Sequence, residues 1–383
     1  MDYRFTEQQE MLRKTVRDFV RKECSIDRMR KLDEEDEFPR DIFDKMRQLG
    51  IMGASVPLEY GGAGGNAIDH VIVIEELAKA SAAIAHLYIS CAIFGSAMIQ
   101  ECASEEQKRF FLPRTANGEL FYALGLTEPN AGSDTAAAQT TAISDGDNYI
   151  INGIKTFITM ADIADYILTL TRTDKSLPKH RGLTMFVVDT KSPGYSTTKL
   201  KKLGMHGAST NEVVFDNVVV PKGNILGGLD GLNSGWSLLL KTLNVEHLSV
   251  ASFALGSAQT PFDIALQYAK ERQQFGQPIG KFQAIGHMLA EMATEIELCR
   301  QLLYYCAWLK SEDLPCFKEI SMAKFYATEL SERSALKAMK IFAGYGYMMD
   351  GDAQRYLRDA LSAAIGGGTS QIQKNMIARQ LGL

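Results

Sequence analysis

Hydrophobic and polar positions follow a helical period at both ends of the chain. Thr6 and Gln9 form a capping-box pattern ahead of an amphipathic segment. A second apolar-periodic region begins near residue 232 and lasts to the end, with stretches over 234–248, 283–308 and 318–342. Pro261 interrupts this region, and it either kinks one long helix or allows Thr260 to cap a new one.

The middle of the chain has a different pattern, with short runs rich in β-branched and aromatic residues. These runs cover 121–126, 149–151, 166–171, 184–188 and 212–220, separated by turn signals. Strands and helices do not alternate, which excludes a Rossmann unit. We therefore predict a multidomain α+β protein. It has an N-terminal helical domain (1–118), a small middle β-barrel or sandwich domain (119–226) and a C-terminal four-helix bundle (227–383).

Composition narrows the possible partners. The chain has 383 residues, 41 basic and 46 acidic side chains and a formal net charge of −5, so nucleic acid is not expected as a partner. Six cysteines without a Cys-x-x-Cys pair, and histidines without metal-ligand spacing, predict no metal site and no disulfide framework. The stretch 80–100 is apolar, but its modest hydrophobicity favours a buried helix over a membrane span. We expect a cytoplasmic protein.

Three segments combine tight turns with polar side chains. They are LTEPNAGSD at 126–134, RQQFG at 272–276 and GGGTSQ at 366–371. No nucleophile elbow, Walker sequence or metal-binding box accompanies them. The first segment could contact a planar heterocycle or a ligand amide, or it could be an ordinary polar turn at a strand end.

These segments resemble motifs of the acyl-CoA dehydrogenase family. NGIKTFIT at 152–159 and the closing RDA and GTSQI motifs between 358 and 372 follow in the family's order and spacing. The resemblance covers essentially the whole chain. It implies an α–β–α fold, FAD as cofactor, an acyl-CoA substrate, electron-transfer flavoprotein as partner, and a homotetramer built as a dimer of dimers.

The resemblance also implies a set of ligand-binding residues. Leu126 and Thr127 would contact the flavin ring, backed by Phe157, Ile158 and Thr159, with Phe157 where many relatives have Trp. The adenine-diphosphate part, shared across a dimer, would use Arg272, Gln274, Phe275, Gln283, Lys340 (often Gln in relatives), Gly344, Thr369 and Gln371. The substrate would contact Leu124, Ser133, Asn244 and Gly368.

The position of the catalytic base departs from the commonest family pattern. Many members carry the Glu that removes the α-proton directly before Gly-Thr-Ser, but here that position is Gly367. The Gly367 N–H can still bind the thioester oxygen. In the branch that resembles isovaleryl-CoA dehydrogenase, the Glu lies on a mid-chain helix, and Glu246 falls at that position. His247 stands where such relatives commonly have Arg.

The implied reaction is α,β-oxidation of a short, branched, cyclic or substituted acyl-CoA, with Glu246 as base. Three alternatives remain: an enoyl-CoA reductase working in the reverse direction, a desulfinase-like relative that cleaves another bond at the β-carbon, and a flavin-free protein that binds CoA esters. The sequence does not distinguish the acyl group or the direction.

Overall fold

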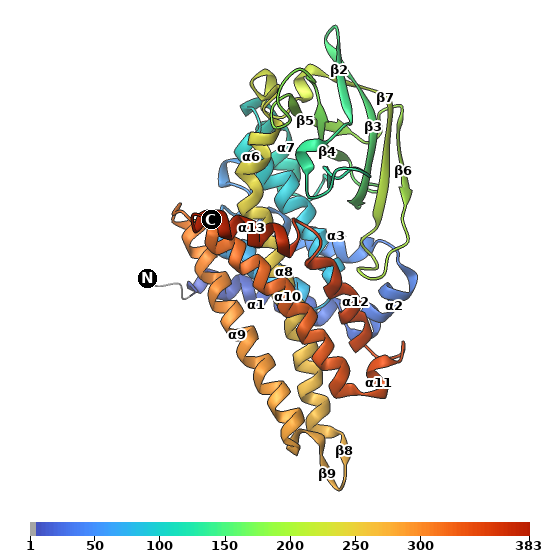
Figure 1. The fold of residues 1–383 in the computed structure, drawn as a ribbon, viewed down its shortest axis with the longest axis vertical. Helices are drawn as coiled ribbons and strands as arrows, with labels where there is room; N and C mark the ends of the chain where they lie inside the picture. Colours follow the sequence, from blue (N-terminus) through green and yellow to red (C-terminus); the bar gives the residue numbers. More distant parts are fainter. Residues whose placement is uncertain (1–4) are drawn as a thin grey trace.

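The computed structural model describes residues 5–383 and arranges them as three parts (Figure 1). The β domain lies at one end, a helical bundle runs to the opposite end, and the N-terminal helices pack beside both. The N-terminal helices are α1 (Glu7–Glu23), α2 (Ile26–Glu35), α3 (Arg40–Gln48), α4 (Ala67–Ala78), α5 (Ala82–Ile89), α6 (Met98–Cys102) and α7 (Glu105–Ala116), with a π-helix, η3 (Ser90–Ala97), between α5 and α6.

Local sequence signals account for the ends of several helices. The Thr6 hydroxyl accepts a hydrogen bond from the Gln9 N–H at 3.2 Å, and the Gln9 side chain accepts one from the Thr6 N–H at 3.0 Å, which confirms the predicted capping box. Within the described residues, 82–102 is the one helical stretch long and apolar enough to cross a membrane. Because 83% of its most apolar window is buried in the protein, it serves as a core helix, as predicted.

The middle domain contains one seven-stranded sheet. Its strands are β1 (Tyr122–Gly125), β2 (Thr141–Asp145), β3 (Asn148–Thr159), β4 (Tyr166–Arg172), β5 (Leu183–Asp189), β6 (Tyr195–Lys199) and β7 (Thr210–Pro221). They follow the order β1-β4-β2-β3-β7-β6, with β5 paired to β4. The sequence patterns miss β2 and β6, because both strands are largely polar and exposed and so lack an apolar face.

The C-terminal part is built on three long helices. It contains α8 (Gly235–Glu271), a hairpin of β8 (Gln273–Gln274) and β9 (Gln277–Pro278), α9 (Gln283–Ser311), α10 (Phe317–Phe342), α11 (Gly344–Tyr347), α12 (Ala353–Ala363) and α13 (Ser370–Gln380). Helix α8 continues through Pro261 as one long helix, so no new helix begins at Thr260. The Thr260 hydroxyl donates to the carbonyl of Lys79 at 2.7 Å instead of capping a new helix.

Candidate functional site

Glu246 lies half-buried in the first third of α8, beside the glycine segment 366–368 that follows α12. A Cβ added at Gly367 would lie 3.7 Å from Oε1 of Glu246, so the carboxylate occupies the space next to this position. Burial raises the pKa of Glu246, and the nearby Lys324 ammonium opposes that rise. A desolvated carboxylate of this kind is a suitable proton acceptor near neutral pH.

The glycine segment presents backbone donors beside this carboxylate. Gly367 and Gly368 have φ values of +60° and +79°, a left-handed conformation that glycine adopts without steric cost. Within residues 5–383, neither of these N–H groups has a hydrogen-bond acceptor. Two free amides next to a carboxylate can stabilise an oxyanion while the carboxylate takes a proton.

The polar groups behind Glu246 are neutral and incompletely paired. Burial and, to a smaller extent, the Lys324 ammonium lower the pKa of His247 to about 4, so the imidazole is uncharged. Its Nε2 lies 3.2 Å from Nε2 of Gln373. Because the amide nitrogen must donate, Nε2 of His247 accepts and Nδ1 carries the proton. This Nδ1 and Oδ1 of Asn244 are buried without a partner among the described residues, as at a site that binds further polar groups.

The turn after β1 is held rigidly by a buried ion pair. The ammonium of Lys155, fully buried, donates to Oε1 of Glu128 at 2.8 Å and to the carbonyl of Leu126 at 3.1 Å. The Thr156 N–H donates to the carbonyl of Thr127 at 2.9 Å. Leu124 and Leu126 are half-buried next to this turn, and Ser133 is exposed at its end. The predicted flavin-contacting residues therefore lie in a backbone of fixed shape.

A β-bulge presents Phe157 on the surface. The register of β3 against β7 shifts between Lys155 and Ile158, and Phe157 takes φ +60°. Its side chain is 67% exposed, whereas Ile158 is buried and Thr159 is half-buried. An exposed aromatic ring at a bulge offers a flat apolar surface on which a planar ring system can pack.

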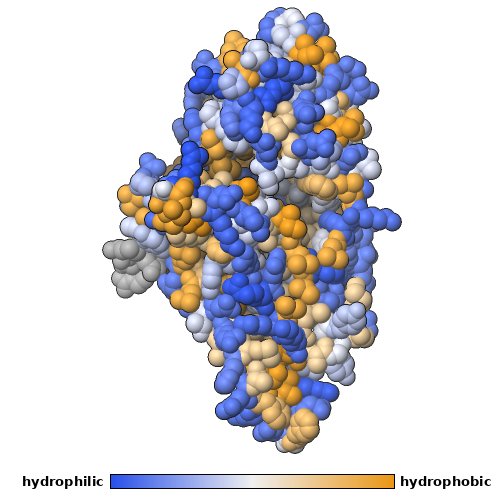
Figure 2. Space-filling view, viewed as in Figure 1, coloured by the Kyte–Doolittle hydropathy of each residue, from blue (hydrophilic) through white to orange (hydrophobic). Residues whose placement is uncertain are grey.

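Five predicted residues line one cavity of about 710 Å³ at the far end of the bundle: Arg272, Gln274, Phe275, Lys340 and Gly344. The guanidinium carbon of Arg272 lies 5.6 Å from the ring centre of Tyr345. Two cations beside aromatic rings suit a diphosphate joined to a purine. Figure 2 shows hydrophobic surface along this lower part of the bundle. Gln283, the first residue of α9, is exposed and does not line this cavity.

Thr369 and Gln371 belong to a different cavity, of about 400 Å³, at the start of α13. The Thr369 hydroxyl accepts from the Ile372 N–H at 3.3 Å and caps α13. The predicted cofactor residues thus fall into three places in one chain. The β domain and the β8–β9 hairpin lie at opposite ends of the molecule (Figure 1).

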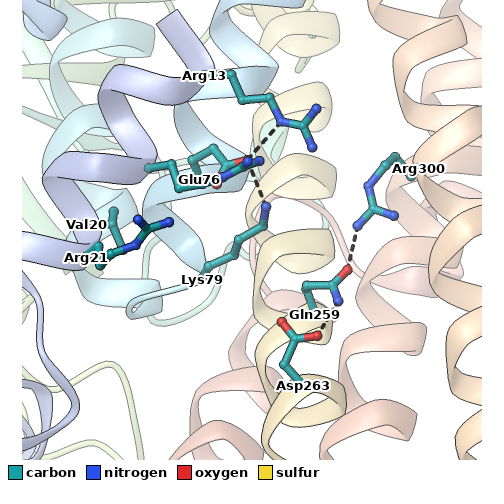
Figure 3. A pocket seen from close by; sticks show the side chains of 9 residues that line it. Arg13, Val20, Arg21, Glu76, Lys79, Gln259, Asp263 and Arg300 are labelled. Atoms are coloured by element: carbon teal, nitrogen blue, oxygen red, sulfur yellow. Dashed lines mark hydrogen bonds and ion pairs between the residues drawn. The ribbon is translucent and has the colours of Figure 1, made fainter. Parts of the chain in front are cut away.

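A further cavity, of about 480 Å³, lies among α1, α4, α8 and α9 (Figure 3). Its Glu76, 2% exposed, pairs with Arg13 at 3.2 Å, Arg17 at 2.8 Å and Lys79 at 2.9 Å. Arg300 pairs with the buried Glu75 at 3.2 Å. Because the cations face carboxylates, this cavity is a charged junction between helices. Among residues 5–383, no three His, Cys, Asp or Glu side chains are grouped so that they could hold a metal ion.

Sequence reasoning missed Lys324, Gln373 and the Lys155–Glu128 pair. The pattern contains a signal for Lys324, since this lysine shares one helix face with Ile320, Ala327 and Ser331, all buried. A lysine on a buried helix face requires polar partners, and these come from the glycine segment.

Comparison with known proteins identifies the class. Models of the acyl-CoA dehydrogenase N-terminal, middle and C-terminal domains match residues 6–119, 123–218 and 233–382. The probable acyl-CoA dehydrogenase YngJ of Bacillus subtilis is 41% identical over 382 residues, covering 100% of both chains. The chain belongs to the acyl-CoA dehydrogenase family, whose members are FAD-dependent oxidoreductases, and the predicted three-part fold is confirmed.

Two further relatives span nearly the whole chain. The caffeyl-CoA reductase-Etf complex subunit CarC of Acetobacterium woodii is 41% identical over 380 residues, covering 98% of this chain and 99% of that protein. The structure of butyryl-CoA dehydrogenase from Megasphaera elsdenii has a TM-score of 0.96 at 34% identity, with 100% of both chains covered.

Proposed function

We propose that this chain is an FAD-dependent acyl-CoA dehydrogenase in which Glu246 removes the α-proton of the thioester. The observation that carries this proposal is the position of the Glu246 carboxylate, beside Gly367 and the free amides of Gly367 and Gly368. The same carboxylate favours proton abstraction over the desulfinase-like alternative.

The residues of this chain divide the work between them. The amides of Gly367 and Gly368 bind the thioester oxygen and stabilise the negative charge that develops there when the α-proton leaves. Glu246, desolvated and poised by its raised pKa, accepts that proton. Bound FAD supplies the hydride acceptor for the β-hydrogen. Leu126, Thr127 and Phe157 orient the ring system against the substrate from the β domain.

The arrangement of cofactor residues supports the dimer from which the proposed homotetramer, a dimer of dimers, would be built. Residues suited to the flavin ring and to its diphosphate lie at opposite ends of one chain, so a partner copy must supply one of the two sets. Arg272 and Lys340 of that copy would pair with the diphosphate, and Thr369 and Gln371 would complete the site.

The acyl group and the electron partner are inferred from the glycine segment and from a named relative. Glycines at 366–368 remove side-chain bulk next to the thioester, which favours a short, branched, cyclic or substituted acyl group. A relative named as a subunit of a reductase-Etf complex supports electron-transfer flavoprotein as partner. Six free buried cysteines among the described residues suit the reducing cytoplasm.

The same relative favours a second candidate, an enoyl-CoA reductase that uses this site in the reverse direction. Glu246 would then return a proton to the α-carbon, since acid and base exchange roles when a reaction is reversed. The direction is distinguished by supplying dithionite-reduced holoprotein with crotonyl-CoA and oxidised holoprotein with butyryl-CoA, and by comparing the two rates.

Anaerobic titration of the oxidised holoprotein tests the proposal. Butyryl-CoA and isovaleryl-CoA should bleach the flavin absorbance, and Glu246→Gln should slow this step about 10²–10⁴-fold with its flavin content unchanged. Glu319→Gln, a change on α10 outside the site, is the matched control. Undiminished bleaching in Glu246→Gln would reject the base. Purified protein without flavin would favour the CoA-ester-binding alternative.

A further inference from the structure

Lys324 is a fully buried lysine on α10 that forms no ion pair within 4 Å in the described chain. A buried ammonium without polar partners is strongly destabilising, so its contacts must compensate for lost hydration. Its Nζ donates to the carbonyls of Ala363 at 3.3 Å, Gly366 at 3.0 Å and Gly368 at 2.5 Å. An ammonium has three N–H donors, and these three carbonyls engage all of them.

These contacts fix the orientation of the peptide groups in the glycine segment. The carbonyls of Gly366 and Gly368 are directed toward Lys324, and the carbonyl of Gly367 accepts from Gln373 at 3.4 Å. With the carbonyl oxygens held on this side, the N–H groups of Gly367 and Gly368 are left without acceptors in residues 5–383. A glycine-rich segment has many accessible conformations, and these bonds select one of them.

The same ammonium acts electrostatically on Glu246. It opposes the rise in the pKa of Glu246 that burial causes, and burial itself lowers the pKa of Lys324 to about 8. Two buried histidines also lie on or against this part of α8. His247 on α8 and His70 on α4, which bonds to Ser249, both have pKa values lowered by burial to about 4 and are neutral. Lys324 therefore provides the positive charge at the base.

We propose that Lys324 is a positioning residue that both orients the amides of Gly367 and Gly368 and keeps Glu246 ionised. The inference rests on the proposed function, in which Glu246 is the base. One buried cation couples the two parts of the site, because the group that holds the oxyanion donors in place also favours the charged form of the proton acceptor.

The test uses two neutral substitutions in the holoprotein, Lys324→Gln and Lys324→Met. Glutamine keeps N–H donors and loses the charge, whereas methionine loses both. The readout is the pH profile of α-proton exchange of butyryl-CoA in D₂O. The Lys324 charge favours the deprotonated form of Glu246, so removing this charge raises the pKa of Glu246. Exchange requires the deprotonated base and therefore begins at a higher pH. The acid limb should move to higher pH by about one unit or more in both variants. At neutral pH, exchange should fall at least tenfold, with the larger loss in Lys324→Met.

The matched control is Thr328→Val, one turn along α10, where a buried hydroxyl donates to the Lys324 carbonyl at 3.0 Å. Its acid limb should coincide with that of the wild type, so a shift there of equal size would assign the effect to general disturbance of α10 and overturn the proposal. An unmoved acid limb in Lys324→Gln would overturn it as well.

Two measurements keep the outcomes separate. If Glu246→Gln retains exchange, the proposed function fails. If that variant is inactive while Lys324→Gln has a wild-type profile, only the Lys324 inference fails. If both neutral variants lack flavin, the coupling is measured in the wild-type holoprotein instead. The protein is labelled with ¹³C-glutamate, and its carboxyl signals are followed by NMR as the pH is raised. The carboxyl signal missing in Glu246→Gln must show a second inflection near the Lys324 pKa of about 8, and its absence would contradict the coupling.

Discussion

Two regions of this molecule, the surroundings of Glu246 and the β8–β9 hairpin, differ in how completely one chain builds them. Around Glu246, α8, α10, α13 and the glycine segment of the same chain supply the groups, and buried hydrogen bonds hold them. At the β8–β9 hairpin, Phe275 is 92% exposed, and Arg272 is exposed beside the ring of Tyr345. Under the proposed function, proton chemistry would be built within one chain, whereas dinucleotide binding would depend on a second copy.

The contrast has a physical basis. Interior polar groups must find partners when the chain folds, so the geometry around Glu246 is fixed by folding itself. The hairpin end carries exposed apolar side chains, including Tyr347 at 79% and Met349 at 71% exposed, which are stabilised only when another surface covers them.

The largest effect is expected from moving the catalytic carboxylate from position 246 to position 367. Glu246→Ala should reduce α-proton exchange of butyryl-CoA about 10²–10⁴-fold. Adding Gly367→Glu should restore much of that loss, because its Cβ would lie 3.7 Å from the position of the removed Oε1. The left-handed backbone at 367 costs the double variant about 1–2 kcal/mol of stability. A double variant that binds flavin but recovers no exchange would contradict the site's location.

A smaller effect, about 3–5 kcal/mol in the free energy of unfolding, is expected from Glu76→Gln, which leaves cations at the charged junction without their carboxylate. Burial alone would raise the pKa of Glu76, but the Arg17 hydrogen bond and the Lys79 charge lower it to about 2. The stabilisation is therefore complete above about pH 4.5 and is lost as pH falls toward 2.

Urea unfolding at pH 7 and at steps down to pH 3 measures this prediction. The variant should be less sensitive to acid than the wild type, and the change should not depend on protein concentration, since the junction lies within one chain. Equal acid sensitivity in both proteins would contradict the assigned role of Glu76. Lys108→Gln, at the exposed pair with Glu105, is the control and should change stability by less than about 1 kcal/mol.

Features that depend on neighbouring residues could be predicted from the sequence, whereas features that depend on distant contacts could not. The capping box at Thr6 and the strand β4 depend on neighbouring residues, and their patterns were sufficient. Strand β6 was missed because its pairing with β7, and not its own polar sequence, makes it a strand. The buried helix face of Lys324 can be recognised in the sequence, but its partners lie 39 to 44 residues away, and no local pattern identifies them. The base candidate Glu246 came from the resemblance, not from periodicity.

At the hairpin end, Arg272→Ala should weaken FAD binding to apoprotein about 10–100-fold, the effect of losing a hydrogen bond to a charged group. Flavin fluorescence during reconstitution measures the affinity. The pH profile of α-proton exchange, measured with saturating FAD, should be unchanged, because Arg272 lines a cavity that does not include Glu246, and Lys324 is the charge that acts on Glu246. A shifted pH profile would show that Arg272 affects Glu246, and would contradict the separation of these two regions.

Mixed oligomers test whether Glu246 of one copy works together with Arg272 of another copy. Co-expression of Arg272→Ala with Glu246→Gln creates sites in which one copy supplies an intact Glu246 and the other an intact Arg272. These hybrids should exceed both parents in butyryl-CoA oxidation at limiting FAD. Activity no greater than the average of the parents would mean that each chain binds its own dinucleotide alone.

The smallest effect is expected at the bulge in the β domain. Phe157 is 67% exposed at φ +60°, so a larger ring has room there and meets no packed neighbour. Phe157→Trp should change FAD affinity by less than about 1.5 kcal/mol, within the range of aromatic pair energies. Phe157→Ser removes the ring and should weaken binding more than Trp does. Reconstitution of both apoproteins measures the difference, and equal affinities would exclude Phe157 from contact with the flavin ring. That result would leave Leu126 and Thr127 as the β-domain contacts.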